Sequence, residues 1–348
     1  MKTVVEDMRA GIDEAGIGRA GEILRRGGLV AFPTETVYGL GADALDEKAA
    51  AKIYGAKGRP SDNPLIVHIA DWEAIHRIVS ELPAEAELLQ KAFWPGPLTM
   101  ILKKSDEVPL TTTGGLSTVA VRMPSDPVAQ AVIRAGGGYI AAPSANTSGR
   151  PSPTTAQHVA EDMDGVIDMI IDGGSVAIGL ESTIVDLTGE VPTILRPGYI
   201  SQEMLAKVIG EVEIDRGLIS ENSSVRPKAP GMKYRHYAPR AELIIVEGSE
   251  ERVRAKINEL TRQQELSGKK VGVIGTDESL EYYQSGTVKS IGSRQDEITI
   301  AQHLYGILRE FDQSDISVIY SEAFETPNMG QAIMNRLIKA AGHQIIQA

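Results

Sequence analysis

The chain has 348 residues, of which 42% are hydrophobic and 24% are charged, values typical of a soluble globular protein with two domains of ordinary size. It contains no cysteine, which excludes disulfides, thiolate catalysis and cysteine-based zinc sites. The net charge of −12 argues against broad, nonspecific nucleic-acid binding, which depends on neutralising phosphates.

The first 200 residues alternate between helix-like and strand-like patterns. Apolar residues at helical spacing between Ile12 and Arg26 predict a helix that ends at the pair Gly27 and Gly28. The same patterns predict further helices over 84–93 and 127–135, and strands over 29–32, 65–69, 98–102, 118–122, 139–142, 169–172, 182–187 and 193–196. This mixed order indicates an α/β sheet with some antiparallel pairs.

From Glu211 to Arg240 the periodic pattern breaks. The stretch is polar and rich in proline, which is typical of a linker or an ordered extended loop. Beyond it, strands predicted over 243–247, 270–274, 287–291 and 316–321 alternate with helices over 250–264, 298–312 and 330–341. Such repetition indicates a small doubly wound parallel sheet.

The first segment that suggests chemistry is FPTETVYGLGADA, from Phe32 to Ala44. Hydroxyl and carboxylate side chains at the exit of a strand are placed to hold a small polar ligand, and Thr36 is one of them. A simple turn, with Thr34 as a helix cap, is the alternative interpretation.

The segment KGRPSDNPLIVHI carries two basic residues, Lys57 and Arg59, followed by Asn63. In an extended loop both cations reach one phosphate group, because arginine binds two oxygens at once and lysine supplies a point charge. The alternative interpretation is that Lys57 and Arg59 are exposed, solvated charges. His68 ends the strand that follows, where a histidine is also common as a structural residue.

Three more segments place polar side chains at strand ends. Arg122 closes the strand over 118–122, where a cation indicates a carboxylate or phosphate partner or a structural salt bridge. The loop APSANTSGRPSPTT, from Ala142 to Thr155, is rich in small donors and predicts an anion-binding nest or an ordinary polar loop before a helix capped by Thr154 or Thr155. Ser182 and Arg196 follow in GLESTIVDL and LRPGYIS.

The segment PGMKYRHYAP, from Pro230 to Pro239, concentrates cations and tyrosines inside the predicted linker. A flexible tether needs neither, so this composition predicts a segment that docks on something anionic.

In their order and spacing, PTETVYGLG, KGRPSDNPL, APSAN, ESTIVD and LRPG resemble the Sua5/YrdC/YwlC family of threonylcarbamoyl-AMP synthases, in its longer two-domain Sua5 form. The resemblance implies a YrdC-like twisted mixed sheet with helices over residues 10–210, a linker or lid over 211–240, and a small doubly wound Rossmann-like α/β domain over 241–348. It also implies an enzyme that forms threonylcarbamoyl-AMP and pyrophosphate from L-threonine, bicarbonate or CO₂, and ATP.

The family's site residues carry over onto matching positions of this chain. Those expected around threonine are Thr36, His68, Arg122, Ala142 and Ser182. Those expected around ATP are Arg59, Asn63, Thr118, Ser144, Asn146, Ser152, Arg196 and Tyr237, with Lys57 and Arg59 as the catalytic cations. Ala142 departs from the serine of many relatives, which leaves a backbone contact there intact. Mg²⁺ is expected to enter on the phosphates of ATP, with no protein side chain as its ligand.

The resemblance further implies a role in forming N6-threonylcarbamoyladenosine in tRNA, with a tRNA threonylcarbamoyltransferase as the downstream partner and at most a weak RNA contact. An RNA-binding module without catalysis and a carbamoyltransferase acting on another amine are the rival interpretations. The absence of a long apolar run and of a signal peptide predicts a cytoplasmic protein without membrane contact.

Overall fold

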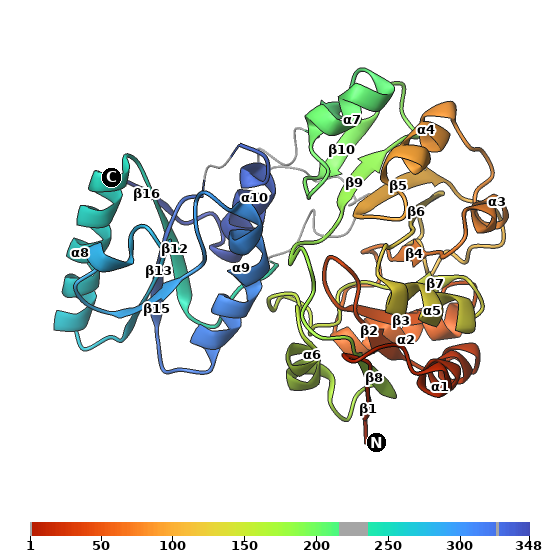
Figure 1. Cartoon of the computed structure of the whole chain (residues 1–348), viewed down its shortest axis with the longest axis horizontal. Coiled ribbons are helices and arrows are strands. Elements are labelled where there is room, and N and C mark those ends of the chain that lie inside the picture. The colour runs from red at the N-terminus through yellow and green to blue at the C-terminus, as the bar shows by residue number, and fades with distance from the viewer. Residues whose placement is uncertain (1, 216–235, 325–326) are drawn as a thin grey trace. The chain divides into compact units, whose positions relative to one another are not determined.

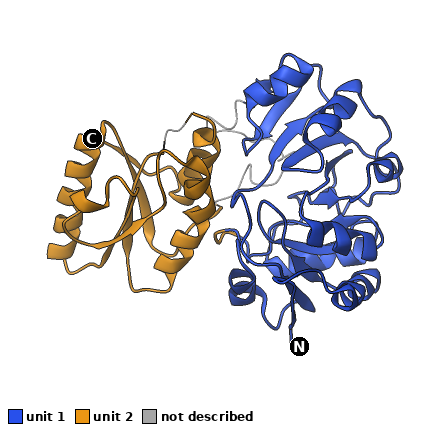
Figure 2. Ribbon diagram, viewed as in Figure 1, with its two compact units in different colours: residues 1–148, 152–233 blue, residues 149–151, 234–348 orange. Residues whose placement is uncertain are grey.

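The computed structural model describes residues 2–215, 236–324 and 327–348 (Figure 1). The chain divides into two compact units (Figure 2): the first comprises Met1–Ser148 and Ser152–Lys233, and the second comprises Gly149–Pro151 and Tyr234–Ala348. Within the described residues, no helix is long and apolar enough to cross a membrane.

The first unit is built on a mixed sheet, whose described strands have the order β1-β8-β2-β3-β7-β4-β6-β5-β9-β10-β11. The strands are β1 Val4–Asp7, β2 Val30–Phe32, β3 Gly39–Asp43, β4 Ile66–His68, β5 Leu98–Lys103, β6 Thr118–Arg122, β7 Ile140–Ala141, β8 Met169–Asp172, β9 Thr183–Asp186, β10 Thr193–Arg196 and β11 Glu213–Ile214. The sheet contains parallel pairs, such as β4–β6, and antiparallel pairs, such as β5–β6. The predicted mixed sheet is confirmed.

Seven α-helices are described in this unit, and five of them begin at a polar side-chain cap. They are α1 Glu14–Arg25, α2 Glu47–Lys57, α3 Ile75–Ile78, α4 Ala84–Phe93, α5 Pro127–Ala135, α6 Ala156–Met163 and α7 Gln202–Ile209, with a 3₁₀ turn over Trp72–Ala74. Asp13, Asp46 and Asp126 accept backbone N–H groups at the starts of α1, α2 and α5, as N-caps do. Thr155 caps α6, one of the two residues predicted for that role.

Several elements of the first unit were not predicted: β1, β3, α2, α3, α7 and β11. Strand β3 is the one that matters most for the site. It runs antiparallel between β2 and β7 although its sequence, GLGAD, has no β-branched residue. A Cβ at Gly41 would lie 2.7 Å from the Phe32 ring, so the close approach of β2 and β3 requires glycine there.

The second unit contains a parallel sheet with the strand order β14-β13-β15-β12-β16. Its strands are β12 Glu242–Glu247, β13 Val271–Gly275, β14 Thr287–Ser290, β15 Val318–Glu322 and β16 Ile345–Gln347, the last of which was not predicted. Helix α8, Glu250–Leu266, covers one face, and α9, Glu297–Asp312, and α10, Gly330–Ala340, cover the other (Figure 1). The predicted doubly wound parallel sheet is confirmed.

Candidate functional site

A buried polar cluster lies where three neighbouring strands of the first unit meet. His68 ends β4 and Arg122 ends β6, and these two residues are register partners in the parallel pair β4–β6. Arg122 also faces Thr99 of β5 across the antiparallel pair. All three side chains are buried. Strand register therefore brings together a cation, an imidazole and a hydroxyl that are distant in sequence.

The turn after β2 adds Thr36 to this cluster. The Thr34 hydroxyl oxygen accepts the backbone N–H groups of Thr36 and Val37, at 3.2 and 3.3 Å, and its hydroxyl donates to the Val37 carbonyl. Thr34 therefore shapes this turn and does not cap a helix. Arg122 Nη1 donates to Thr36 Oγ1 at 2.8 Å, so the turn and the strand end are joined directly.

The electrostatics of the cluster are dominated by Arg122. Burial and the nearby Arg122 charge lower the pKa of His68 to about 3, so His68 is neutral at physiological pH. Its Nδ1 lies 3.1 Å from the Ile66 carbonyl oxygen, which accepts a hydrogen bond from the tautomer that carries its proton on Nδ1. Arg122 Nη2 lies 2.8 Å from Glu35 Oε1. A buried positive charge therefore stands beside a neutral imidazole and one carboxylate.

Ser182 extends the cluster toward β10. Its hydroxyl lies 2.8 Å from the Thr99 hydroxyl and accepts a hydrogen bond from Arg196 Nη2 at 3.1 Å. Arg196 Nε also donates to the Ser182 carbonyl at 3.0 Å. The glycine of LRPG explains this fit, because a Cβ at Gly198 would lie 2.5 Å from the backbone nitrogen of Thr183. Thr36, His68, Arg122, Ser182 and Arg196, named separately from sequence, lie together.

Lys57 and the loop after β7 form a second group. Lys57 is the last residue of α2 and is only 2% exposed, so the expected extended loop is wrong at this position, and so is the alternative of an exposed, solvated lysine. The chain turns at Gly58, whose φ of 61° lies in the left-handed region. Lys57 Nζ donates to the carbonyl oxygens of Ser144 and Asn146. The buried ammonium group of Lys57 therefore holds the backbone of the loop after β7 in place.

The rest of the loop holds further candidate residues. Ala142 is buried and its backbone N–H donates to the Ile66 carbonyl, which ties the loop to β4. Ser144 bridges to Gly39 of β3. Ser152 is 1% exposed, and its hydroxyl donates to Glu181 Oε1 at 2.6 Å.

Arg59 and Asn63 form a third group. Arg59 Nη2 donates to the Pro64 carbonyl at 3.0 Å, which folds its side chain over the segment before β4. Asn63 is 2% exposed. Thr118 begins β6, four residues before Arg122, so it lies about 13 Å from Arg122 along the strand at a rise of ~3.3 Å per residue.

Tyr237 belongs to the second unit. Its ring is buried and stacks on Tyr305, with the ring centroids 5.2 Å apart. The same unit includes Gly149–Pro151, where Arg309 donates to the Pro151 carbonyl at 2.6 Å. The predicted docking segment lies outside the described residues from Pro230 to Arg235.

Sequence reasoning missed Thr99 and Glu181 as members of these groups, and it included Glu35 only as the carboxylate at the strand exit, without a role of its own. Glu35 and Glu181 each precede a named residue, Thr36 and Ser182, within the motifs PTET and LEST. A carboxylate next to a candidate ligand-binding hydroxyl was the available signal.

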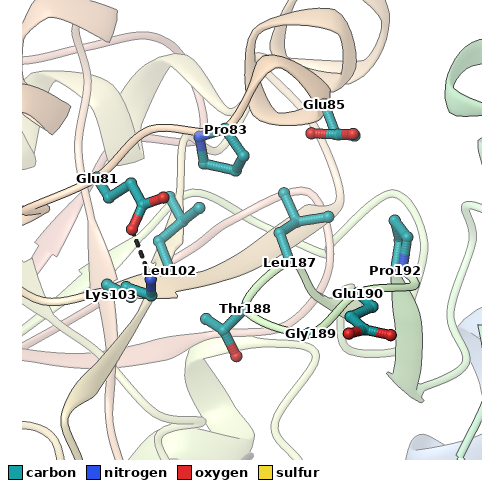
Figure 3. A pocket seen from close by; sticks show the side chains of 10 residues that line it. All are labelled: Glu81, Pro83, Glu85, Leu102, Lys103, Leu187, Thr188, Gly189, Glu190 and Pro192. Atoms are coloured by element: carbon teal, nitrogen blue, oxygen red, sulfur yellow. Dashed lines mark hydrogen bonds and ion pairs between the residues drawn. The ribbon is translucent and has the colours of Figure 1, made fainter.

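A separate cavity of about 340 Å³ lies at the carboxyl ends of β5 and β9, whereas Thr99 and Ser182 lie near the amino ends of these strands (Figure 3). Leu102 and Leu187 form part of its lining, and an exposed ion pair between Lys103 and Glu81 stands at its edge. None of the predicted site residues lines it, so we do not assign the reaction to this cavity.

Two family models match the chain in sequence order. The Sua5_yciO_yrdC model, described as telomere recombination, matches residues 22–198, and the model of the C-terminal domain of threonylcarbamoyl-AMP synthase matches residues 200–342. The chain belongs to the Sua5/YrdC family. It is therefore an enzyme of the family's nucleotidyltransferase type.

Full-length relatives agree with this assignment. The chain is 51% identical over 345 residues to the threonylcarbamoyl-AMP synthase of Pyrococcus abyssi, covering 99% of both proteins. It is 50% identical over 332 residues to the enzyme of the same name from Bacillus subtilis, covering 95% of this chain and 94% of the relative. The crystal structure of P. abyssi Sua5 complexed with L-threonine superimposes with a TM-score of 0.95 at 50% identity, covering 99% of this chain and 100% of that one.

Proposed function

We propose that this chain forms threonylcarbamoyl-AMP and pyrophosphate from L-threonine, bicarbonate and ATP. The observation that carries the proposal is the buried cluster around Arg122, in a chain that matches a named threonylcarbamoyl-AMP synthase over 99% of its length. The P. abyssi relative has been crystallised with L-threonine, which is the amino acid that this proposal requires.

Threonine fits the chemistry of the Arg122 cluster. The guanidinium of Arg122 suits a carboxylate, because charge-assisted hydrogen bonds between the two are strong and directional. The hydroxyls of Thr36 and Ser182 suit a hydroxyl that both donates and accepts. His68, neutral at physiological pH, adds no charge that would repel an ammonium group. The backbone of Ala142 completes the set that we assign to threonine.

ATP would occupy the neighbouring groups. We assign its phosphates to Arg59, whose side chain is partly exposed, and to Arg196, with small donors from Ser144, Asn146 and Ser152 around them. Thr118 and Asn63 are assigned to a more distant part of the nucleotide, because the strand places Thr118 far from Arg122. Tyr237 stays an expected nucleotide contact. Mg²⁺ would enter bound to the phosphates, since it favours phosphate and water oxygens over an all-protein cage.

The reaction follows from these positions. Bicarbonate, or CO₂ derived from it, adds to the threonine amine to give a carbamate. A carbamate oxygen then attacks the α-phosphorus of ATP, and pyrophosphate leaves. Catalysis rests on positioning and on cations that stabilise the developing phosphate charge. Arg59 supplies charge directly, whereas Lys57 acts by holding the Ser144 and Asn146 carbonyls.

The product would serve the formation of N6-threonylcarbamoyladenosine at position 37 of tRNAs that read ANN codons. Because a carbamoyl adenylate is an activated acyl donor, a separate threonylcarbamoyltransferase would transfer the group to tRNA. A cytoplasmic location suits this role.

Mass spectrometry of the products from ATP, bicarbonate and threonine tests the proposal. We expect threonylcarbamoyl-AMP and pyrophosphate, with ATP consumption that requires both other substrates. Release of ADP and phosphate would refute adenylation.

A further inference from the structure

Glu35 stands in the turn between β2 and β3, next to Thr36 in the chain. Its side chain is only 9% exposed. Its backbone carbonyl accepts the N–H of Ile178, which fixes the residue in place. Its carboxylate oxygen Oε1 lies 2.8 Å from Arg122 Nη2.

The hydrogen bonding around this ion pair is incomplete. Arg122 Nη2 and Glu35 Oε1 form a buried ion pair at 2.8 Å, but neither of these atoms, nor the buried Glu35 Oε2, makes a hydrogen bond of regular geometry among the residues that the structure describes. Buried polar atoms are almost always hydrogen-bonded, and exceptions need an explanation such as a ligand or a catalytic role. A buried ion pair that keeps this hydrogen-bonding capacity is complementary to a ligand that carries both charges.

A free α-amino acid is such a ligand. Its carboxylate suits Arg122, and its ammonium group, one carbon away, needs a nearby anion. The residues assigned above to threonine supply a cation, two hydroxyls and a neutral imidazole, but no anion.

Neighbouring carboxylates already have other partners. Asp126, whose pKa is raised by burial and further by the charge of Glu35, accepts the Ala129 N–H at 2.9 Å as the N-cap of α5. Glu181 accepts the Ser152 hydroxyl. Among these three carboxylates, Glu35 is the one whose oxygens have no hydrogen bond within the described part of the chain.

We infer that Glu35 binds the α-ammonium group of threonine and takes one of its protons as the carbamate forms. This inference rests on the proposed function. Threonine enters as a zwitterion, and an ammonium group has no lone pair with which to attack carbon. One N–H proton passes to the Glu35 carboxylate, and the freed lone pair forms the N–C bond.

The step balances with bicarbonate as the carbon source. The ammonium form of threonine, bicarbonate and the Glu35 carboxylate give the carbamate, water and the Glu35 carboxylic acid. The C–O bond to the departing hydroxyl breaks, and that hydroxyl leaves as water with the second N–H proton. Glu35 returns its proton to solvent when the products leave.

Threonine binding to the full-length chain, measured by calorimetry without ATP, tests the charge contact. The probes are L-threonine and 2,3-dihydroxybutanoate, in which a hydroxyl replaces the ammonium group. Glu35→Gln should weaken threonine binding by roughly 10- to 150-fold, as expected for losing a charge-assisted contact. It should change binding of 2,3-dihydroxybutanoate, which keeps the carboxylate but lacks the ammonium charge, far less, and Glu35→Asp should recover part of the threonine affinity. Equal losses for both probes would mean that Glu35 only orients Arg122, and would overturn the inference.

The pH dependence of turnover tests the proton transfer. With Glu35→Gln, activity should rise toward the alkaline range where the threonine amine loses its proton in water, and the gap to wild type should narrow. A gap that stays constant with pH would refute the transfer. Glu81→Gln, on the exposed pair with Lys103, is the surface control. Threonylcarbamoyl-AMP formation by wild type tests the proposed function separately. A failure of the proposed function is therefore distinguishable from a failure of the role inferred for Glu35.

Discussion

Lys57→Met is the most informative single change outside the Arg122 cluster. Methionine keeps most of the buried stem and removes the ammonium group, which donates to the carbonyls of Ser144 and Asn146. A hydrogen bond to a charged group contributes about 1.5–3 kcal/mol, so two such bonds set an upper range of about 3–6 kcal/mol. Water entering beside the freed carbonyls would recover part of this. We expect a loss of about 3 kcal/mol in the free energy of unfolding.

Thermal unfolding of the full chain measures this loss. A unit of 150–250 residues shifts its midpoint by about 2–4 °C per kcal/mol, so the transition of the first unit should fall by roughly 6–12 °C. ATP use should also fall, because the loop with Ser144 and Asn146 loses its anchor. Lys48→Met is the matched control, an exposed lysine on the same helix. Equal midpoints for the two variants would refute the structural role of Lys57.

Two further predictions concern the substrates. Arg59→Ala should lower kcat/KM for ATP by roughly 10- to 150-fold in steady-state assays. The melting midpoint should not change, since this partly exposed side chain contributes little to the core. Full activity of the variant would show that Arg59 is a solvated surface charge. Serine, which lacks one methyl group, should be used about 10- to 200-fold less well than threonine, and valine less well still, because it leaves buried hydroxyls unpaired. Equal turnover of valine in the same product assay would remove Thr36 and Ser182 as the groups that recognise the hydroxyl.

The sequence predicts much of the fold because most strands carry their own signal. Apolar runs such as those of β5 and β6 are recognisable as strands from sequence alone. After residue 240, strands and helices alternate regularly, and this alternation identifies the parallel sheet. Strand β3 has no such signal, because its pairing with β2 and β7 decides its conformation. Helix α2 was missed although Asp46 caps its start and Gly58 follows its end, both of which are readable signals.

Side-chain direction marks the limit of prediction for the site. The motifs name Thr36, Arg122 and Ser182, but only the folded chain shows that Arg122 contacts Thr36 and that Ser182 contacts Thr99, the register partner of Arg122. Nothing in the spacing of Lys57 and Arg59 indicates that one is buried and the other partly exposed. That difference arises because α2 extends through Lys57 and carries it under the loop that follows β7. Motif residues are therefore predictable as a set, while their separate roles depend on packing.

The burial of His68 predicts a specific sensitivity to acid. Its pKa is lowered from 6.5 to about 3 in the folded chain, by burial first and by Arg122 second. Below pH 6.5 the unfolded chain therefore binds a proton at His68 that the folded chain does not bind. The free energy of unfolding keeps its full value above that pH and declines as the pH falls toward 3. Between pH 7.5 and 5 this linkage amounts to about 2 kcal/mol.

His68→Asn removes the titrating group and keeps a donor for the Ile66 carbonyl, which His68 Nδ1 contacts at 3.1 Å. Urea unfolding of wild type and variant at pH 7.5, 6 and 5 should show wild type losing about 2 kcal/mol more than the variant over this range. The comparison uses the change with pH, so a constant penalty for the substitution itself cancels. Parallel declines for the two proteins would mean that His68 accepts its proton in the folded state. The imidazole beside Arg122 would then be positively charged near pH 5, and it would repel the ammonium group of threonine.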